Sequence, residues 1–114
     1  MMMKELKMFA DKTTGLIDEA INCEYTNAKE KWGDRYASLH EGFAVLLEEI
    51  EECRREQKGM RYNNRNLFNF IMNGEKCQAM NITIAHIMTN ARHLAMEACQ
   101  VAAVCKKMLD GVER

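Results

Sequence analysis

Apolar residues recur along the first part of the chain at intervals of three and four positions, which is the period of an amphipathic helix. These positions are Leu6, Phe9, Leu16, Ile17, Ala20 and Ile21. The pattern predicts a first helix over residues 3–32, with the first plausible break at Gly33-Asp34.

A second helix is predicted from its start signal. Ser38 begins the sequence S-L-H-E, a capping box in which the Ser hydroxyl accepts a backbone N–H of the first turn. The carboxylate of Glu41 can reach back to the cap in return. We therefore predict a helix from Leu39 to about Lys58, which Gly59 closes.

The rest of the chain is also expected to be helical, apart from one turn. Residues 60–72 (MRYNNRNLFNFIM) predict a short third helix, although their four Asn residues disfavour helix interiors. Asn73-Gly74 is a turn signal. Residues 75–109 then predict a long final helix, either continuous or bent near Thr89-Asn90, and Asp110-Gly111 marks its end.

The composition supports one all-α domain. The 114 residues include no Pro and only six Gly, with 47% apolar and 29% charged residues. A chain of this length buries only a modest core, so association with a second copy would add stability. We predict an all-α, oligomeric bundle of three to four helices with a long C-terminal helix, in a single domain over residues 1–114.

Charge and cysteine content limit the partners and the compartment. The net charge of −1 gives no bulk attraction to nucleic acid polymers or to an anionic membrane. Neither the N-terminal segment nor any later one has the long apolar run of a signal peptide or membrane span. Five cysteines, an odd number without a CxxC pair, are expected to be buried reduced thiols, which indicates a cytoplasmic protein. They are Cys23, Cys53, Cys77, Cys99 and Cys105.

The predicted second helix carries a row of carboxylates. On a helical wheel Glu41, Glu48 and Glu52 line one side, and Glu49 and Glu56 flank that row. Like charges at this spacing repel, and a hard divalent cation such as Mg²⁺ would offset the repulsion. The alternative is an ordinary solvated acidic face. The opposite side, predicted to face the core, consists of Phe43, Leu46, Leu47, Ile50 and Cys53.

The final helix carries a narrow polar stripe. It consists of His86, Asn90, His93, Glu97 and Gln100. Amides, imidazoles and one carboxylate are typical of a site lined for hydrogen bonding, whereas a solvated face is more often rich in Lys and Glu. The stripe could equally bond to another helix or face water. The seven-residue separation of the histidines is not the His-x-x-x-His spacing of a helical zinc site.

Two blocks of the sequence carry a family resemblance. The first is SLHEGFAVLLEEIEE at residues 38–52, which contains the pattern E-E-x-x-E at residues 48–52. The second is EACQVAAVCKK at residues 97–107. Together they resemble small members of the MazG-like, all-α nucleoside triphosphate pyrophosphohydrolases that occur in phages and prophages. The two blocks cover under a quarter of the chain.

The resemblance implies a MazG-like helical bundle that forms a homodimer or homotetramer, in the host cytoplasm if the protein is phage-encoded. In active relatives the E-E-x-x-E carboxylates and a later E-x-x-D pair hold Mg²⁺. The metal binds the triphosphate, and an activated water releases pyrophosphate. By position, Glu48, Glu49 and Glu52 map to the first motif, and Glu97 maps to the glutamate of the second.

The chain departs from the family pattern at one position. Gln100 stands where active relatives have Asp. A neutral amide brings no charge, so its presence weakens both metal binding and the activation of water. The departure favours binding over catalysis.

Three functions follow as hypotheses. The first is a nucleotide-binding protein that sequesters a nucleotide, including a signalling nucleotide, with little or no turnover. The second is a Mg²⁺-dependent nucleoside triphosphate pyrophosphohydrolase that uses the remaining carboxylates. The third is a non-catalytic helical interaction protein. The expected nucleotide-binding residues are Arg61, Arg65, Tyr62, Asn90, His93 and Gln100, with Trp32 as a further candidate to stack on a base.

Overall fold

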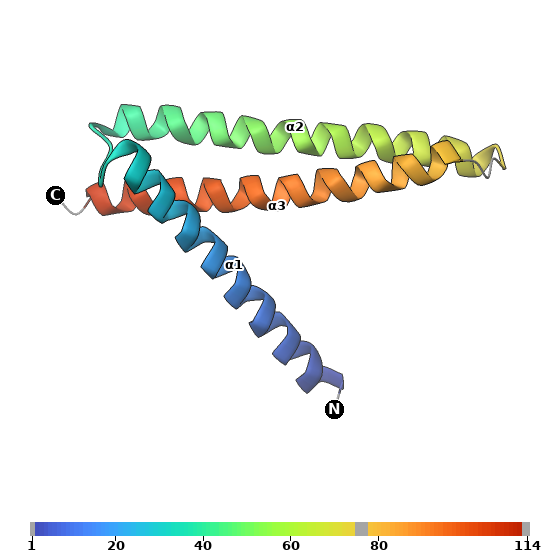
Figure 1. Cartoon of the computed structure of the whole chain (residues 1–114), viewed down its shortest axis with the longest axis horizontal. Helices are drawn as coiled ribbons and strands as arrows, with labels where there is room; N and C mark the ends of the chain where they lie inside the picture. The colour runs from blue at the N-terminus through green and yellow to red at the C-terminus, as the bar shows by residue number, and fades with distance from the viewer. Residues whose placement is uncertain (1, 75–77, 113–114) are drawn as a thin grey trace. The chain divides into compact units, whose positions relative to one another are not determined.

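The computed structural model describes residues 2–74 and 78–112, which form three long α-helices (Figure 1). Helix α1 spans Met2–Trp32, α2 spans Leu39–Met72 and α3 spans Gln78–Val112. No β-strand occurs among these residues, so the all-α class is confirmed. Within the same ranges, no helix has both the length and the apolar content needed to cross a membrane.

Helix α2 begins where the capping box predicts and runs beyond the predicted end. The hydroxyl of Ser38 accepts the backbone N–H of Glu41 at 3.2 Å, and the Glu41 carboxylate accepts the N–H of Ala37 at 3.4 Å. The prediction that Gly59 ends this helix was wrong, because the helix continues to Met72 and absorbs the predicted third helix. A single interior Gly costs a helix only about 1 kcal/mol, which a long packed helix tolerates.

Helix α3 is one continuous helix without an interruption at Thr89-Asn90. It also continues through Asp110-Gly111 to Val112, so the predicted stop was placed too early. The predicted first residues of this helix, 75–77, and with them Cys77, lie outside the described residues. The turns that do end helices use glycine in the left-handed region, with φ of 88° at Gly33 and 69° at Gly74.

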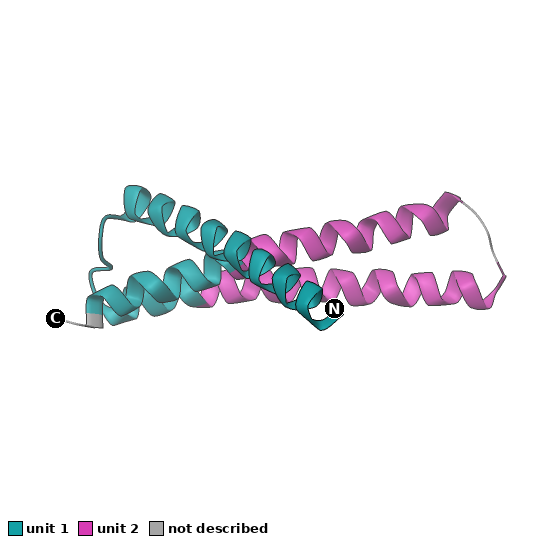
Figure 2. Cartoon of the chain, turned by 90° about the horizontal axis from the view of Figure 1, so that it is seen from below, with its two compact units in different colours: residues 1–46, 99–114 teal, residues 47–98 magenta. Residues whose placement is uncertain are grey.

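The chain divides into two compact units (Figure 2). Unit 1 combines Met1–Leu46 with Cys99–Arg114, and therefore contains α1, the start of α2 and the end of α3. Unit 2 is Leu47–Ala98, a helical hairpin made of the remaining parts of α2 and α3.

Unit 1 is held by close backbone approach and by aromatic contacts. A Cβ atom at Gly42, which is buried, would lie 3.0 Å from Cγ of Met108 and 3.1 Å from the Tyr36 ring. The Tyr25 hydroxyl donates a hydrogen bond to the Asp110 carboxylate. These contacts join the start of α2 and the C-terminal part of α1 to the C-terminal part of α3.

The apolar side of α2 is not the core face that the pattern predicts. Phe43, Leu47 and Ile50 are 59%, 49% and 38% exposed, and only Leu46 and Cys53 of the predicted set are half-buried. Among the described residues the fully buried apolar side chains are Ala103 and Val104 of α3. The wheel separates the polar and apolar sides of α2, but the apolar side is left largely uncovered within the chain.

The described cysteines carry free thiols, as expected for a protein without a disulfide framework. Cys53 and Cys99 are half-buried, whereas Cys23 and Cys105 are exposed. The prediction that all of them are buried was therefore wrong for these last two, which lie on the outer sides of α1 and α3.

Candidate functional site

Three carboxylates gather in unit 2, and we call them the acidic trio. Glu49 and Glu52 lie three positions apart on α2, a spacing that places both on one side of the helix. Glu97 approaches them from α3. One oxygen from each carboxylate lies within 4.8 Å of the other two, and all three residues are half-buried. The first motif and the second therefore meet at one point in the fold.

The surroundings of Glu97 change its protonation. Burial, hydrogen bonding with Glu52 and the negative charges of Glu52 and Glu49 together raise the pKa of Glu97 to about 7. Burial and the same three carboxylates also raise the pKa of the Cys53 thiol. Near neutral pH the trio therefore takes up a proton or attracts a cation.

The trio suits a hard divalent cation. Mg²⁺ prefers oxygen ligands at 2.0–2.1 Å, so two of its ligands lie at most about 4.2 Å apart. The trio's oxygens, within 4.8 Å of one another, would have to move closer together to bind one such ion at the same time. Such an ion would offset the repulsion among Glu49, Glu52 and Glu97, and would retain waters that phosphate oxygens can replace.

The fourth predicted metal ligand, Glu48, is placed differently. It is exposed and is not part of the trio. Adjacent helical positions differ by about 100° around the axis, so Glu48 points away when Glu49 and Glu52 face α3. The E-E-x-x-E pattern therefore supplies two carboxylates to the group, and the third comes from Glu97.

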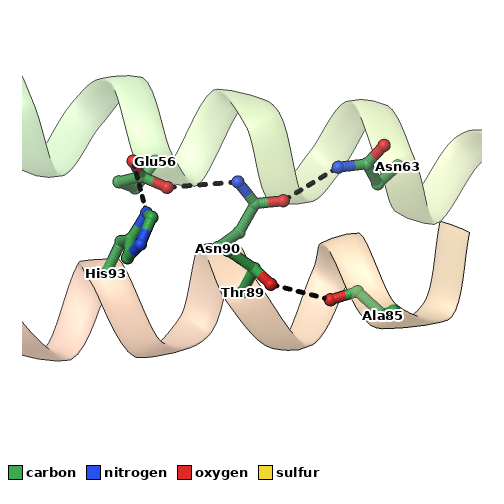
Figure 3. A network of polar contacts seen from close by, with 6 residues as sticks. All are labelled: Glu56, Asn63, Ala85, Thr89, Asn90 and His93. Carbon is green, nitrogen blue, oxygen red and sulfur yellow. Dashed lines mark hydrogen bonds and ion pairs between the residues drawn. The ribbon is translucent and has the colours of Figure 1, made fainter. Parts of the chain in front are cut away.

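A polar network joins the two helices of unit 2 (Figure 3). The Asn90 side-chain amide donates to the Glu56 carboxylate at 3.1 Å, and the Asn63 amide donates to the Asn90 carbonyl oxygen at 2.8 Å. The imidazole Nδ1 of His93 lies 3.5 Å from the other Glu56 oxygen. A Cβ atom at Gly59 would lie 2.9 Å from the Asn90 amide nitrogen, so glycine is needed for this approach.

The network explains part of the predicted polar stripe, includes Glu56 from the flank of the predicted acidic row, and adds Asn63, which the sequence did not single out. Asn90 and His93 do face α2, where Glu56 and Asn63 bind them. Glu56 lies four positions after Glu52, so it continues the inward row by one turn. The four-residue spacing of Glu52 and Glu56, followed by Gly59, is the sequence feature from which the network could have been predicted.

The predicted phosphate and base contacts lie away from the trio. Arg61, Tyr62 and Arg65 are exposed and follow Glu52 by nine to thirteen positions, which is about 14–20 Å along the helix axis. Arg61 lines an open hollow of about 410 Å³ in unit 2. The other residues that line it are Gln57, Met60, Asn64, Ile87 and Leu94.

Two further predicted contacts lie in unit 1. Gln100 is half-buried, three positions after Glu97 on α3. Trp32 is exposed at the end of α1, and the ammonium of Lys31 lies 5.2 Å from the centroid of its ring. Trp32 is therefore engaged by its neighbour in sequence.

Comparison of the chain with protein-family models, with curated proteins and with solved structures finds no match. The MazG-like resemblance therefore rests on the two blocks at residues 38–52 and 97–107.

Proposed function

We propose that this protein binds a nucleotide through a divalent cation held by the acidic trio, with little or no turnover. The observation that carries the proposal is the approach of Glu97 to Glu49 and Glu52 within 4.8 Å. These are the carboxylates that the MazG-like resemblance assigns to metal binding. Their approach from two helices of one unit supports a shared site over a solvated acidic face.

The side chains beside the trio have distinct proposed roles. Glu49, Glu52 and Glu97 hold Mg²⁺, which supplies charge and exchangeable waters for a phosphate group. Asn90 is a positioning residue, because both ends of its amide are used by Glu56 and Asn63. His93 has a more than half-exposed side chain and offers a hydrogen bond to the nucleotide.

The preference for binding over turnover rests on Gln100. This residue stands at the position of the second carboxylate in the E-x-x-D motif of active relatives. An amide oxygen contributes no negative charge, so the site holds Mg²⁺ less tightly, and a site with less bound metal generates less activated water. Sequestration of a nucleotide needs the binding step only.

A specific observation supports the alternative of a Mg²⁺-dependent nucleoside triphosphate pyrophosphohydrolase. Glu49, Glu52 and Glu97 approach one another within 4.8 Å, so the carboxylates that remain beside Gln100 could together hold Mg²⁺. In that alternative the bound ion would supply the activated water. Production of pyrophosphate distinguishes it from sequestration.

Binding and turnover are tested together. Calorimetry with Mg²⁺ against a panel of linear and cyclic nucleotides measures affinity, and phosphorus NMR of the same samples detects pyrophosphate. Glu52→Gln is expected to weaken binding at least tenfold, whereas Glu48→Gln, an exposed carboxylate outside the trio, serves as the matched control. Equal losses in both variants, or no binding of any nucleotide by the intact protein, would remove the proposal.

We also propose that the protein associates with itself as a homodimer or homotetramer. Phe43, Leu47 and Ile50 recur along α2 and are exposed in the chain, which is the pattern of a helix side that packs on a partner. Sedimentation analysis tests this, and Leu47→Glu is expected to shift the protein to monomer. A monomeric wild-type protein would refute the proposed self-association.

A further inference from the structure

A second site candidate lies in unit 1, at the start of α2. A cavity of about 160 Å³ is bounded by residues 35–39, which join α1 to α2, and by Lys107, Met108 and Gly111 of α3. Two of its lining residues, Arg35 and Lys107, are cationic, and none of the lining residues within 2–74 and 78–112 is a carboxylate. The cavity therefore has a positive lining although the whole chain has a net charge of −1.

Lys107 is unusual among the described residues because its side chain is fully buried. Its ammonium has one hydrogen-bond acceptor, the carbonyl oxygen of Ala28 at the long distance of 3.5 Å. It also lies 4.1 Å from the centroid of the Tyr36 ring. An ammonium carries three N–H donors, so most of its hydrogen-bonding capacity is unused within the described chain.

Acidic side chains near Lys107 only partly compensate its charge. Asp34 and Glu41 both act to raise the pKa of Lys107, but burial outweighs them and Lys29 opposes them, so the pKa is lowered. Glu41 is engaged in the cap of α2, where it accepts the N–H of Ala37. A buried charge without an ion pair is costly to a fold unless something else neutralises it.

We propose that this cavity binds a small oxyanion, specifically a phosphate group, with Lys107 as its buried cation and Arg35 at its rim. The first turn of α2 adds the positive end of a long helix dipole to the same cavity. The cavity volume of about 160 Å³ leaves room for one phosphate group.

The phosphate group has two possible sources, inorganic phosphate and the end of a phosphate monoester whose remainder stays outside. Calorimetry on the full chain compares sodium phosphate, a nucleoside monophosphate and sodium acetate at constant ionic strength. Phosphate is expected to bind in a one-to-one ratio per chain and to raise the melting temperature. If the monoester binds as well as phosphate, the cavity is open to solvent beside the bound phosphate group. If phosphate alone binds, the cavity encloses the whole anion. Acetate binding as strong as phosphate binding would overturn the assignment.

Lys107→Met is the decisive variant, because it keeps the length of the side chain and removes its charge. The affinity for phosphate is expected to fall about tenfold or more, as for a lost charge-assisted hydrogen bond. Lys106→Met is the matched control, since the exposed Lys106 ammonium binds the Asn22 side chain at 2.8 Å and does not line the cavity. Equal phosphate affinity in Lys107→Met and the wild type, or none in the wild type, would refute the inference.

A second variant keeps the test independent of folding. Arg35 is exposed, so Arg35→Gln leaves the core unchanged and is expected to weaken phosphate binding severalfold. If Lys107→Met does not fold, an unchanged affinity in Arg35→Gln would still refute the inference. The inference does not rest on the proposed nucleotide site, because Glu52→Gln is expected to leave phosphate binding in unit 1 intact.

Discussion

The raised pKa of Glu97 makes a prediction about stability that requires no ligand. The carboxyl has an ordinary pKa of 4.5, and burial together with Glu52 and Glu49 raises it to about 7 in the folded chain. The folded state therefore holds this proton more tightly than the unfolded state does. Stability from this group is fully present below pH 4.5 and is lost as the pH rises to about 7.

The size of the effect follows from the two pKa values. At 1.36 kcal/mol for each tenfold change in proton affinity, the difference corresponds to roughly 3 kcal/mol. Glu97 is only half-buried and solvent screens its neighbours, so we expect about 1–3 kcal/mol. Glu97→Gln removes the charge and should stabilise the protein by this amount at pH 8 and very little at pH 4.5.

The assay is urea unfolding at fixed protein concentration, in EDTA, at several values between pH 4.5 and 8. The wild type should lose stability relative to Glu97→Gln across this range, and the difference should level off above pH 7. Glu48→Gln is the control for removal of an acidic side chain from α2 outside the trio. A Glu97→Gln protein no more stable than the wild type at pH 8 would refute the electrostatic argument.

Three further predictions concern single contacts and the cation. Gly59→Ala is expected to destabilise the chain by about 1–3 kcal/mol, because the new methyl group would displace the Asn90 amide. Gly15 has open space around it, so Gly15→Ala should stabilise α1 by up to about 1 kcal/mol. Thermal unfolding of the two variants and the wild type tests both expectations. Tyr25→Phe removes the hydrogen bond to Asp110 and should cost about 1 kcal/mol in urea unfolding. Adding Mg²⁺ at pH 8 should raise the melting temperature of the wild type. It should leave the melting temperature of a variant that lacks one trio carboxylate unchanged. An equal rise in melting temperature in both proteins would contradict a metal at the trio.

The sequence predicted the helices well where a long, uninterrupted period was present. The first helix and the start of the second match because periodic apolar positions and the Ser38 capping box are local signals. The end of α2 did not match, because Gly59 was interpreted as a helix terminator. In the fold this glycine instead makes room for Asn90, a requirement set by a residue 31 positions away.

The candidate site was predictable in part for a similar reason. A helical wheel places Glu49 and Glu52 on one side of α2, but it does not determine which side faces α3. The apolar side was assigned to the core, but its Phe43, Leu47 and Ile50 are exposed, and the packing brings Glu49 and Glu52, without Glu48, to Glu97. Lys107 gave no signal at all, because it follows Lys106 in an ordinary basic pair and differs from it only in the fold.

The small amount of apolar burial has a consequence for how the protein behaves in dilute solution. With Ala103 and Val104 as the fully buried apolar side chains of the described chain, few backbone amides are shielded by a deep interior. Deuterium uptake by the amides of α2 should therefore be rapid in dilute samples. It should slow when the concentration rises enough for the exposed Phe43–Ile50 surface to be covered, so every comparison between variants needs a matched dilution.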